Sequence, residues 1–372
     1  MEACSESVSV VTRNPHCAQV LLNENAGYQC RTNVPFVRSV SDGFPRTQYR
    51  RRTSEAKSVI HWGQRKLLIS EIEFLTEHGA LSPIVVYAGA APGSHLHQLA
   101  SFFPLHKFVC FDPAPFNVRL RENLITKQEM FTNDVALEFA NQPILFISDI
   151  RAADHDFVDG AAFQAQVSLD MHQQQHWVSI MKPAASLLKF CLPYEAGATS
   201  YLSGSIRLPV WGPITTTETR LLVKGSDLSQ KIYDHRTYEE NMFFFNTTMR
   251  VALFEHDCEG EGLDHCYDCR AEVEILQQFI ESEHYIAFAD EQAASDKTHS
   301  QSSISARVAS LSRAISRAIP GGRTLIDANP DARLRKNGMR QRQWVGNKPA
   351  YEPAVSSEWE QVTRRKQRGR RR

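Results

Sequence analysis

The stretch from Ile84 to Leu99 constrains the fold of this chain more than any other. Residues 84–87 are apolar and mostly β-branched, which predicts a short buried strand. Residues 89–93 are small and turn-forming, and residues 94–99 have helical spacing. A strand, a small-residue turn and a helix in this order let the backbone approach a ligand closely. The stretch therefore predicts an α/β domain with a ligand site at this turn, although an ordinary strand-to-helix turn would have the same appearance.

An acidic residue after the next apolar run favours a nucleotide ligand. Residues 107–111 predict a second strand, and Asp112 follows it directly. Asp112 lies about twenty residues beyond the turn, where a carboxylate can accept hydrogen bonds from ribose hydroxyls. The turn departs from the dinucleotide pattern G-x-G-x-x-G, because Ala91 replaces the second glycine and Pro92 breaks the register. This favours S-adenosylmethionine (SAM), which has no pyrophosphate, over a dinucleotide.

Further apolar runs extend the predicted sheet. Strands are expected at residues 143–149, 186–192, 208–211 and 219–223, and helices at 64–78, 163–181, 236–242 and 271–283. Runs that end in polar residues are typical of parallel strands whose carboxyl ends line one crevice. The fold class is therefore α/β, with a central, mostly parallel sheet and helices on both faces.

Four charged residues lie where such a sheet can bring them together. Lys66 falls in the first turn of a predicted helix, where the dipole disfavours a cation, and Lys189 lies inside an apolar strand. Asp149 ends one strand and Glu218 begins another. A lysine whose pKa is lowered by burial and a nearby cation can remove the proton of a poor nucleophile such as a ribose 2′-hydroxyl. The set suits methyl transfer from SAM to that hydroxyl.

Composition bounds the remaining possibilities. Hydrophobic residues make up 42% of 372 residues, which is enough for a sizeable core, and the formal net charge is zero. No apolar run approaches the roughly 18 residues of a membrane span, and neither a secretory signal nor a disulfide framework is visible among the eight cysteines. Zinc ligation by Cys258, His265, Cys266 and Cys269 is disfavoured because their spacing is wrong for a finger or ribbon. We therefore expect no metal site.

At these residues the chain resembles the poxvirus-type cap-specific mRNA (nucleoside-2′-O-)-methyltransferases, a branch of the Rossmann-like SAM-dependent RNA methyltransferases. The resemblance runs from about residue 63 to 246, in the family's order and spacing. It is carried by the motifs Gly63–Leu68, Val85–Gly93, Ile147–Arg151, Ser186–Lys189 and Glu218–Leu222. Departures from the family pattern, and the segments at either end that match nothing in it, indicate a relative from outside the poxviruses.

The resemblance implies roles for individual residues. The family's catalytic set falls on Lys66, Asp149, Lys189 and Glu218, with Lys189 as the base. SAM contacts are implied at the following positions: Gln64, Tyr87, Gly89, Ala91, Pro92, Gly93, His95, Asp112, Val135 and Asp149.

The family also binds cationic 7-methylguanosine between two aromatic rings, with carboxylates at the base edge. This implies Tyr194 as one ring, and Glu195 and Glu239 as the acids. Tyr49 is the candidate for the second ring. Cys191 replaces an arginine of the family, and Glu195 is one residue out of register.

The two ends of the chain differ in composition from the middle. We expect a loosely ordered arm at 1–45, the methyltransferase domain at 46–290, an amphipathic helical extension at 291–319 and a basic, disordered tail at 320–372. The helix at 304–319 docks a protein partner, faces RNA or packs on the domain. Other capping or polyadenylation factors are further candidate partners. Capped RNA is the expected partner. The basic tail favours the nucleus, with a cytoplasmic viral factory or virion as the alternative. Internal-site 2′-O-methylation of RNA and a non-catalytic RNA-binding or polyadenylation subunit are the rival functions.

Overall fold

The computed structural model describes residues 34–50, 63–152, 160–213, 216–225, 228–250, 252, 254–258, 263, 265–293 and 302–319. The predicted tail at 320–372 and residues 1–33 of the predicted arm lie outside these ranges. The helices are α3 (Gly63–His78), α4 (Leu96–Phe102), α5 (Asn133–Glu138), α6 (Gly160–Met181), α7 (His235–Phe244), α8 (Tyr267–Glu281), α9 (Glu283–Ala293) and α10 (Ile304–Ala318), with a 3₁₀ turn η1 (Gly79–Leu81) and a π-helical turn η2 (Phe245–Met249).

A central sheet of eight strands has the order β1-β8-β9-β6-β5-β2-β3-β4. Its strands are β1 (Ser39–Val40), β2 (Ile84–Ala88), β3 (Lys107–Phe111), β4 (Leu124–Lys127), β5 (Leu145–Ser148), β6 (Ala185–Phe190), β8 (Ser205–Arg207) and β9 (Thr219–Lys224). The strands from β6 to β4 run parallel, whereas β9, β8 and β1 add antiparallel pairs at one edge. The predicted fold class, a mostly parallel sheet in an α/β domain, is confirmed.

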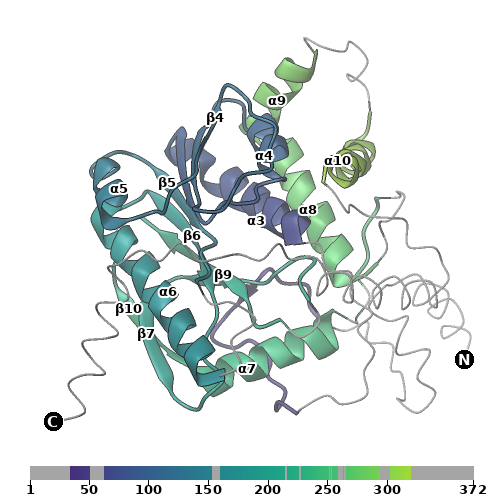
Figure 1. Ribbon diagram of the computed structural model, residues 1–372. Helices are drawn as coiled ribbons and strands as arrows, with labels where there is room; N and C mark the ends of the chain where they lie inside the picture. Colours follow the sequence, from purple (N-terminus) through teal and green to yellow (C-terminus); the bar gives the residue numbers. More distant parts are fainter. Residues whose placement is uncertain are drawn as a thin grey trace, which may run out of the picture.

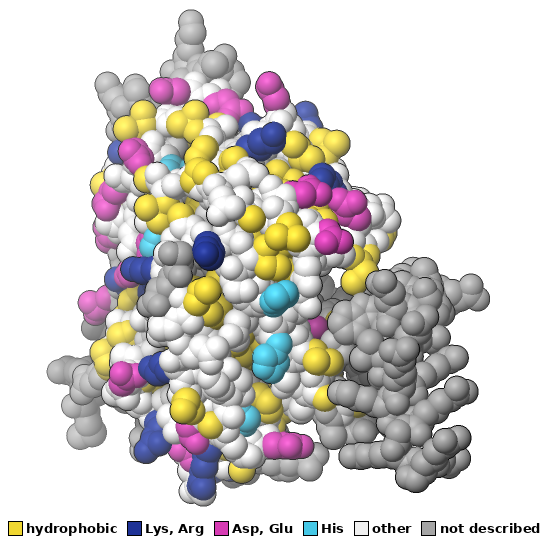
Figure 2. Space-filling model, turned by 90° about the vertical axis from the view of Figure 1, so that its left-hand side faces the viewer, with side chains coloured by type: hydrophobic (Ala, Val, Ile, Leu, Met, Phe, Trp, Pro, Cys, Tyr) yellow, Lys and Arg dark blue, Asp and Glu magenta, His cyan; other side chains and the backbone are white. Residues whose placement is uncertain are grey.

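Helices cover both faces of this sheet. Helices α5 and α6 lie on one side, and α3, α4 and α8 lie on the other (Figure 1). The central strands are apolar because both of their faces are buried: Val85, Val86, Leu145 and Phe146 have no exposed surface. On the face of the molecule formed by α5 and α6, basic and acidic side chains are interspersed with apolar ones rather than gathered by sign (Figure 2). None of the described helices has the length and apolarity that a membrane span requires.

The strand predicted at residues 208–211 is wrong. Strand β8 ends at Arg207, one residue before this run. Pro209 has no backbone N–H for a sheet ladder, and Trp211 has a φ of 62° that no strand allows. The apolar residues of the run are nevertheless buried. The run of apolar residues therefore indicated burial correctly but not a strand.

The sequence pattern also missed an antiparallel pair of strands. Strands β7 (Ala198–Leu202) and β10 (Gln230–Asp234) pair with each other as a separate two-stranded sheet. The alternation of apolar and polar residues is weak in β10, because this strand exposes all of its side chains except that of Tyr233. Helix α9 was missed as well, and it crosses the domain boundary that the composition predicted at residue 290.

The predicted N-terminal arm is not loosely ordered throughout. From residue 34 the chain packs on the domain: Phe44 is buried, and β1 pairs with β8. Arg38 forms an ion pair of 2.9 Å with Glu73 of α3. The prediction failed because these contacts are made to residues far away in the sequence.

Candidate active site

The turn after β2 lies where the chain order of the sheet reverses. β2 pairs with β3 on one side and with β5 on the other, so the ends of these three strands meet there. Gly89 has a φ of 79°, and a Cβ atom at this position would lie 2.7 Å from the backbone N of Ile150. Gly93 has a φ of 66°. Both positions favour glycine because their φ angles are positive. At Gly89 the backbone that follows β5 also leaves no room for a Cβ atom.

Asp112 fixes the shape of this turn. Its Oδ2 accepts a hydrogen bond of 3.0 Å from the backbone N of Ala91, and its Oδ1 accepts one of 2.8 Å from Ala114. Each carboxylate oxygen can accept a second hydrogen bond, so Asp112 can hold the turn and bind hydroxyl groups at once. Val135, the other outlying cofactor candidate, is partly buried in the first turn of α5, where the capping side chain of Thr132 accepts from its backbone N.

At two of the positions where SAM contacts are predicted, the side chains are buried and hold the scaffold. Tyr87 and His95 have no exposed surface. The Tyr87 hydroxyl donates to Glu71 at 2.7 Å, and burial raises the pKa of this hydroxyl well above its ordinary value. The His95 ring joins Glu71, at 3.0 Å, to the Gln64 side chain, at 2.8 Å. These two side chains therefore orient Gln64 and the start of α3, and the SAM contacts expected at these positions stay a prediction.

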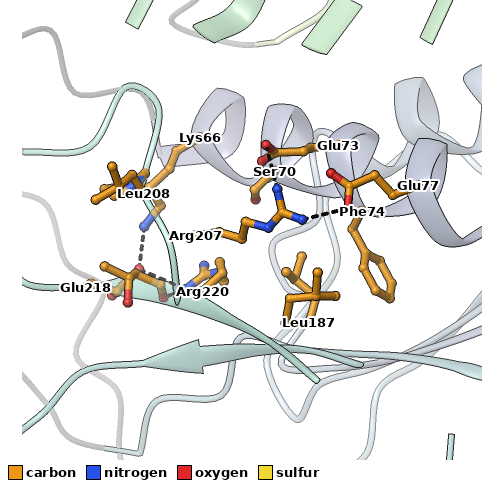
Figure 3. Close-up of a pocket in the computed structure, with 13 residues that line it drawn as sticks. Lys66, Ser70, Glu73, Phe74, Glu77, Leu187, Arg207, Leu208, Glu218 and Arg220 are labelled. Carbon is orange, nitrogen blue, oxygen red and sulfur yellow. Dashed lines mark hydrogen bonds and ion pairs between the residues drawn. The ribbon is translucent and has the colours of Figure 1, made fainter. Parts of the chain in front are cut away.

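The predicted catalytic residues form one ionic cluster, which we define as Lys66, Asp149, Arg151, Lys189, Glu218 and Arg220. Lys66 Nζ lies 2.5 Å from Glu218 Oε1 (Figure 3). Lys189 Nζ lies 2.9 Å from Asp149 Oδ1 and 3.7 Å from Glu218 Oε2. The residues come from the start of α3, from the ends of β5 and β6 and from the start of β9, so only the folded sheet brings them together.

Arg220 and Arg151 are members that the sequence reasoning left without a role. Arg220 binds both carboxylates, at 2.7 Å from Asp149 and 3.3 Å from Glu218, and Arg151 forms an ion pair with Glu218. A signal was present, because each arginine lies two residues after a carboxylate.

Burial and charge act against each other within the cluster. Burial alone would raise the pKa of Glu218, but Lys66, Lys189 and the two arginines outweigh it and hold that pKa well below its ordinary value. The pKa of Asp149 is lowered in the same way, mainly by Lys189 and Arg220. The pKa of Lys66 is lowered by burial, with Arg220 and Lys189 adding to the effect against the attraction of Glu218 and Asp149. Four cations share two carboxylates, so loss of one lysine proton relieves repulsion.

A small cavity lies beside the cluster, between α3 and the antiparallel edge of the sheet. Its volume of about 20 Å³ is enough for one water molecule but not for a substrate. Arg207 crosses it and binds Glu77 of α3 at 2.6 Å (Figure 3). This cavity is therefore part of the support beneath Lys66 rather than a ligand site.

The four predicted cap-binding residues line one open cavity. Tyr49, Tyr194, Glu195 and Glu239 contribute to its wall, and its volume is about 200 Å³. Tyr49 and Tyr194 are 49% and 54% exposed, which leaves both rings available to a ligand. Burial, together with the neighbouring Glu240, raises the pKa of Glu239. An acid-rich cavity with two exposed aromatic rings suits a flat cation.

The zinc candidates Cys258, His265, Cys266 and Cys269 all lie in the described part of the chain. Among the described residues, no group of three or more His, Cys, Asp or Glu side chains is arranged to hold a metal ion. Cys266 instead caps α8, because its sulfur accepts from the backbone N of Cys269 at 3.4 Å.

Known proteins similar to this chain point in one direction. The family model described as "Poly A polymerase regulatory subunit" matches residues 38–294. The cap-specific mRNA (nucleoside-2′-O-)-methyltransferase of Myxoma virus (strain Lausanne) is 30% identical over 237 residues, covering 57% of this chain and 69% of the viral protein. The protein of the same name from Fowlpox virus (strain NVSL) is 27% identical over 237 residues, covering 55% of this chain and 73% of the viral protein.

Solved structures give weaker likenesses. Bluetongue virus VP4, described as a multifunctional RNA-capping production line, has a TM-score of 0.37 and 14% identity over 60% of this chain and 37% of VP4. A putative ribosomal RNA methyltransferase from Plasmodium falciparum has a TM-score of 0.28 and 12% identity, covering 42% of this chain and 95% of that protein. Both scores are too low to support a closer conclusion. The sequence matches decide the family: this chain belongs to the Poly A polymerase regulatory subunit family, together with the poxvirus cap-specific mRNA (nucleoside-2′-O-)-methyltransferases.

Proposed function

We propose that this protein transfers a methyl group from SAM to the ribose 2′-hydroxyl of a nucleotide next to the 7-methylguanosine cap of an RNA. The observation that carries the proposal is the position of the ionic cluster beside the turn after β2. The backbone N of Asp149 donates to the carbonyl of Ala88 at 2.9 Å, directly before that turn. A residue that ends β5 therefore links the proposed cofactor site to the proposed base.

The residues around the turn fit SAM. Gly89 and Ala91 are partly exposed at this turn, and Asp112 keeps lone pairs for ribose hydroxyls while it holds the turn. The Gln64 side chain of α3 is oriented toward the end of this turn, because its Oε1 accepts a hydrogen bond of 3.1 Å from Ser94 Oγ, just before α4. When bound, SAM supplies an electrophilic methyl group on a sulfonium. Every other requirement of the reaction falls to the side chains of this protein.

Lys189 is assigned as the base that removes the proton of the 2′-hydroxyl. Lys66 is already held at 2.5 Å by Glu218, whereas Lys189 lies at the end of β6 beside Asp149. In this assignment Asp149 and Glu218 orient the Lys189 amine, and Lys66 and Arg220 hold the two carboxylates in place. The excess of positive charge in the cluster attracts the phosphates that flank the reacting ribose.

Selection of capped RNA is assigned to the cavity at Tyr49 and Tyr194. The two aromatic rings provide stacking surfaces for 7-methylguanine, and Glu239 and Glu195 provide hydrogen-bond acceptors for its edge. Tyr194 Oη lies 3.0 Å from Thr217 Oγ1, and Thr217 directly precedes Glu218. The cap cavity and the ionic cluster are thus joined through neighbouring residues, as is required when the methylated nucleotide is close to the cap.

The test is methyl transfer from labelled SAM to capped and uncapped RNA of one sequence, followed by nuclease digestion and nucleoside mass spectrometry. We expect a 2′-O-methylnucleoside at the first or second transcribed position of capped RNA alone. Equal labelling of uncapped RNA would favour internal-site methylation. Absence of labelling, together with tight RNA binding, would favour the non-catalytic role.

A second candidate function is support of a poly(A) polymerase, and the observation that favours it is the description of the matching family model. The assay is the length of poly(A) made by a catalytic subunit from the same source, with and without this protein. The Lys189→Ala variant separates the functions, because it should lose methyl transfer and keep any effect on tail length. The predicted nuclear location is likewise a proposal, which imaging of the full chain tests.

A further inference from the structure

A buried carboxylate in α8 joins three separate parts of the chain. Glu272 is fully buried, and Arg65 of α3 binds it through two nitrogens, at 2.9 and 2.5 Å. The indole N–H of Trp211 donates to it at 2.7 Å, and the hydroxyl of Ser312 on α10 donates at 2.6 Å. A carboxylate has about four acceptor positions, so these four hydrogen bonds saturate it.

The neighbouring carboxylate of α8 holds the segment that leads to Glu218. Asp268 accepts from the backbone N of Trp211 at 3.0 Å and forms a fully buried ion pair of 2.9 Å with Arg250. Arg250 in turn donates to the carbonyls of Gly212 and Pro213, at 2.7 and 2.9 Å. Residues 211–213 are therefore fixed to α8 through both their side chains and their backbone.

This arrangement bears on the ionic cluster from two sides. Arg65 directly precedes Lys66, and residues 211–213 precede Glu218 on the way to β9. Lys66 and Glu218, which are 2.5 Å apart, thus lie on two segments that a single helix holds in place.

Helix α10 completes the support, although the family model ends at residue 294, before it begins. α10 packs on α8 (Figure 1), and its apolar residues Val308, Leu311 and Ile315 are buried there. The apolar face of residues 304–319 therefore packs on the domain, as one of the alternatives expected, and is not the docking face for a protein partner. Besides Ser312, α10 contributes Ser316, whose hydroxyl accepts from Arg65 at 3.0 Å.

We propose that Glu272 and Ser312 are positioning residues for methyl transfer. Through Arg65 and Trp211 they fix the first turn of α3 and the segment before Glu218, and so set the geometry of the Lys66–Glu218 pair. The extension at α10 is then part of the catalytic scaffold. This inference rests on the proposed function, since it names the reaction whose geometry is set.

Ser312→Ala tests it with little risk to folding, because it removes one hydroxyl. Ser310→Ala is the matched control: it makes the same change on an exposed position of α10. Rates are measured well below the melting temperature of each variant. We expect kcat of Ser312→Ala to fall about tenfold with KM for SAM and for capped RNA unchanged, since even a misplacement of about 1 Å can cost about 10²-fold. Ser310→Ala should match the wild type.

Hydrogen exchange of residues 63–70 gives a readout that does not depend on activity. We expect faster exchange there in Ser312→Ala and Glu272→Gln than in Ser310→Ala. An unchanged kcat for Ser312→Ala in an active wild-type background, with or without a lower melting temperature, would overturn the inference. If the wild type itself fails to methylate capped RNA, the proposed function fails. In that case hydrogen exchange of residues 63–70 still tests whether Glu272 and Ser312 hold the first turn of α3. Equal exchange in all variants would overturn that part of the inference.

Discussion

Lys189 Nζ lies 2.9 Å from Asp149 Oδ1, and the two residues lie at the carboxyl ends of the neighbouring parallel strands β6 and β5. This contact places an amine at the point where the strand order of the sheet reverses, beside the turn that carries Gly89. The ends of parallel strands at such a point are where α/β proteins bind ligands. The pair thus connects the topology of the sheet to the chemistry proposed for it.

Replacing Lys189 by alanine should abolish most methyl transfer and leave SAM binding nearly unchanged. Loss of a positioned general base costs roughly 10²–10⁴ in rate, and the Lys189 amine contacts Asp149 and Glu218 rather than the turn at residues 89–93. Single-turnover rates and calorimetry with SAM are the measurements. Lys224→Ala, an exposed lysine at the end of β9, is the control. Turnover close to that of the control would remove Lys189 from the mechanism.

Stability should depend on the charge of Glu218 at acid pH. Its folded-state pKa lies well below the ordinary value of 4.5, so its stabilising contribution is complete above about pH 4.5 and is lost as pH falls toward the folded pKa. Glu218→Gln should therefore lower the melting temperature near neutral pH, and the difference from the wild type should narrow below pH 4.5. Thermal melts between pH 3 and pH 7 measure this. A difference that does not vary with pH would show that the charge of Glu218 is not responsible.

Asp112→Ala should weaken SAM binding because the turn loses its acceptor for the backbone N of Ala91 and the ribose loses a charged partner. A charge-assisted hydrogen bond contributes about 1.5–3 kcal/mol, which corresponds to an increase in Kd of roughly 10- to 100-fold. Isothermal titration with SAM measures the change. Asp42→Ala, which removes a highly exposed carboxylate, should leave Kd as it is. An unchanged Kd for Asp112→Ala would exclude Asp112 from the cofactor site.

Tyr194→Ala should raise KM for capped RNA and leave SAM binding unchanged. Loss of stacking on one aromatic ring costs roughly 1–3 kcal/mol, and the Tyr194 side chain is exposed rather than part of the core. Tyr194→Phe keeps the ring and loses only the contact with Thr217, so it should stay close to the wild type.

Competition experiments check the same assignment without a variant. 7-Methylguanosine nucleotide should inhibit methylation of capped RNA, whereas unmethylated guanosine nucleotide should inhibit poorly because its ring is not cationic. Equal inhibition by the two nucleotides would argue against a cap site at this cavity.

The sequence by itself determined the local elements that carry the chemistry. The apolar runs of β2, β3, β5, β6 and β9 were visible because strands buried on both faces must be apolar along their whole length. The small residues between Gly89 and Gly93 were visible because a close backbone approach allows few others. Lys66 and Lys189 stood out because each opposes the preference of its own element, one at a helix N-terminus and one in an apolar strand.

Only the tertiary structure decided which of these groups meet and what holds them. Arg151 joins the ionic cluster through Glu218, which lies 67 residues away in the sequence. Arg220 joins it through Asp149, which lies 71 residues away. The burial of Tyr87 and His95, and the hydrogen bonds of both side chains to Glu71, are likewise visible only in the folded chain. The roles of Glu272 and α10 also depend on contacts between distant segments. Periodicity and local preference describe each element alone, whereas burial and ion pairing between elements are properties of the folded chain.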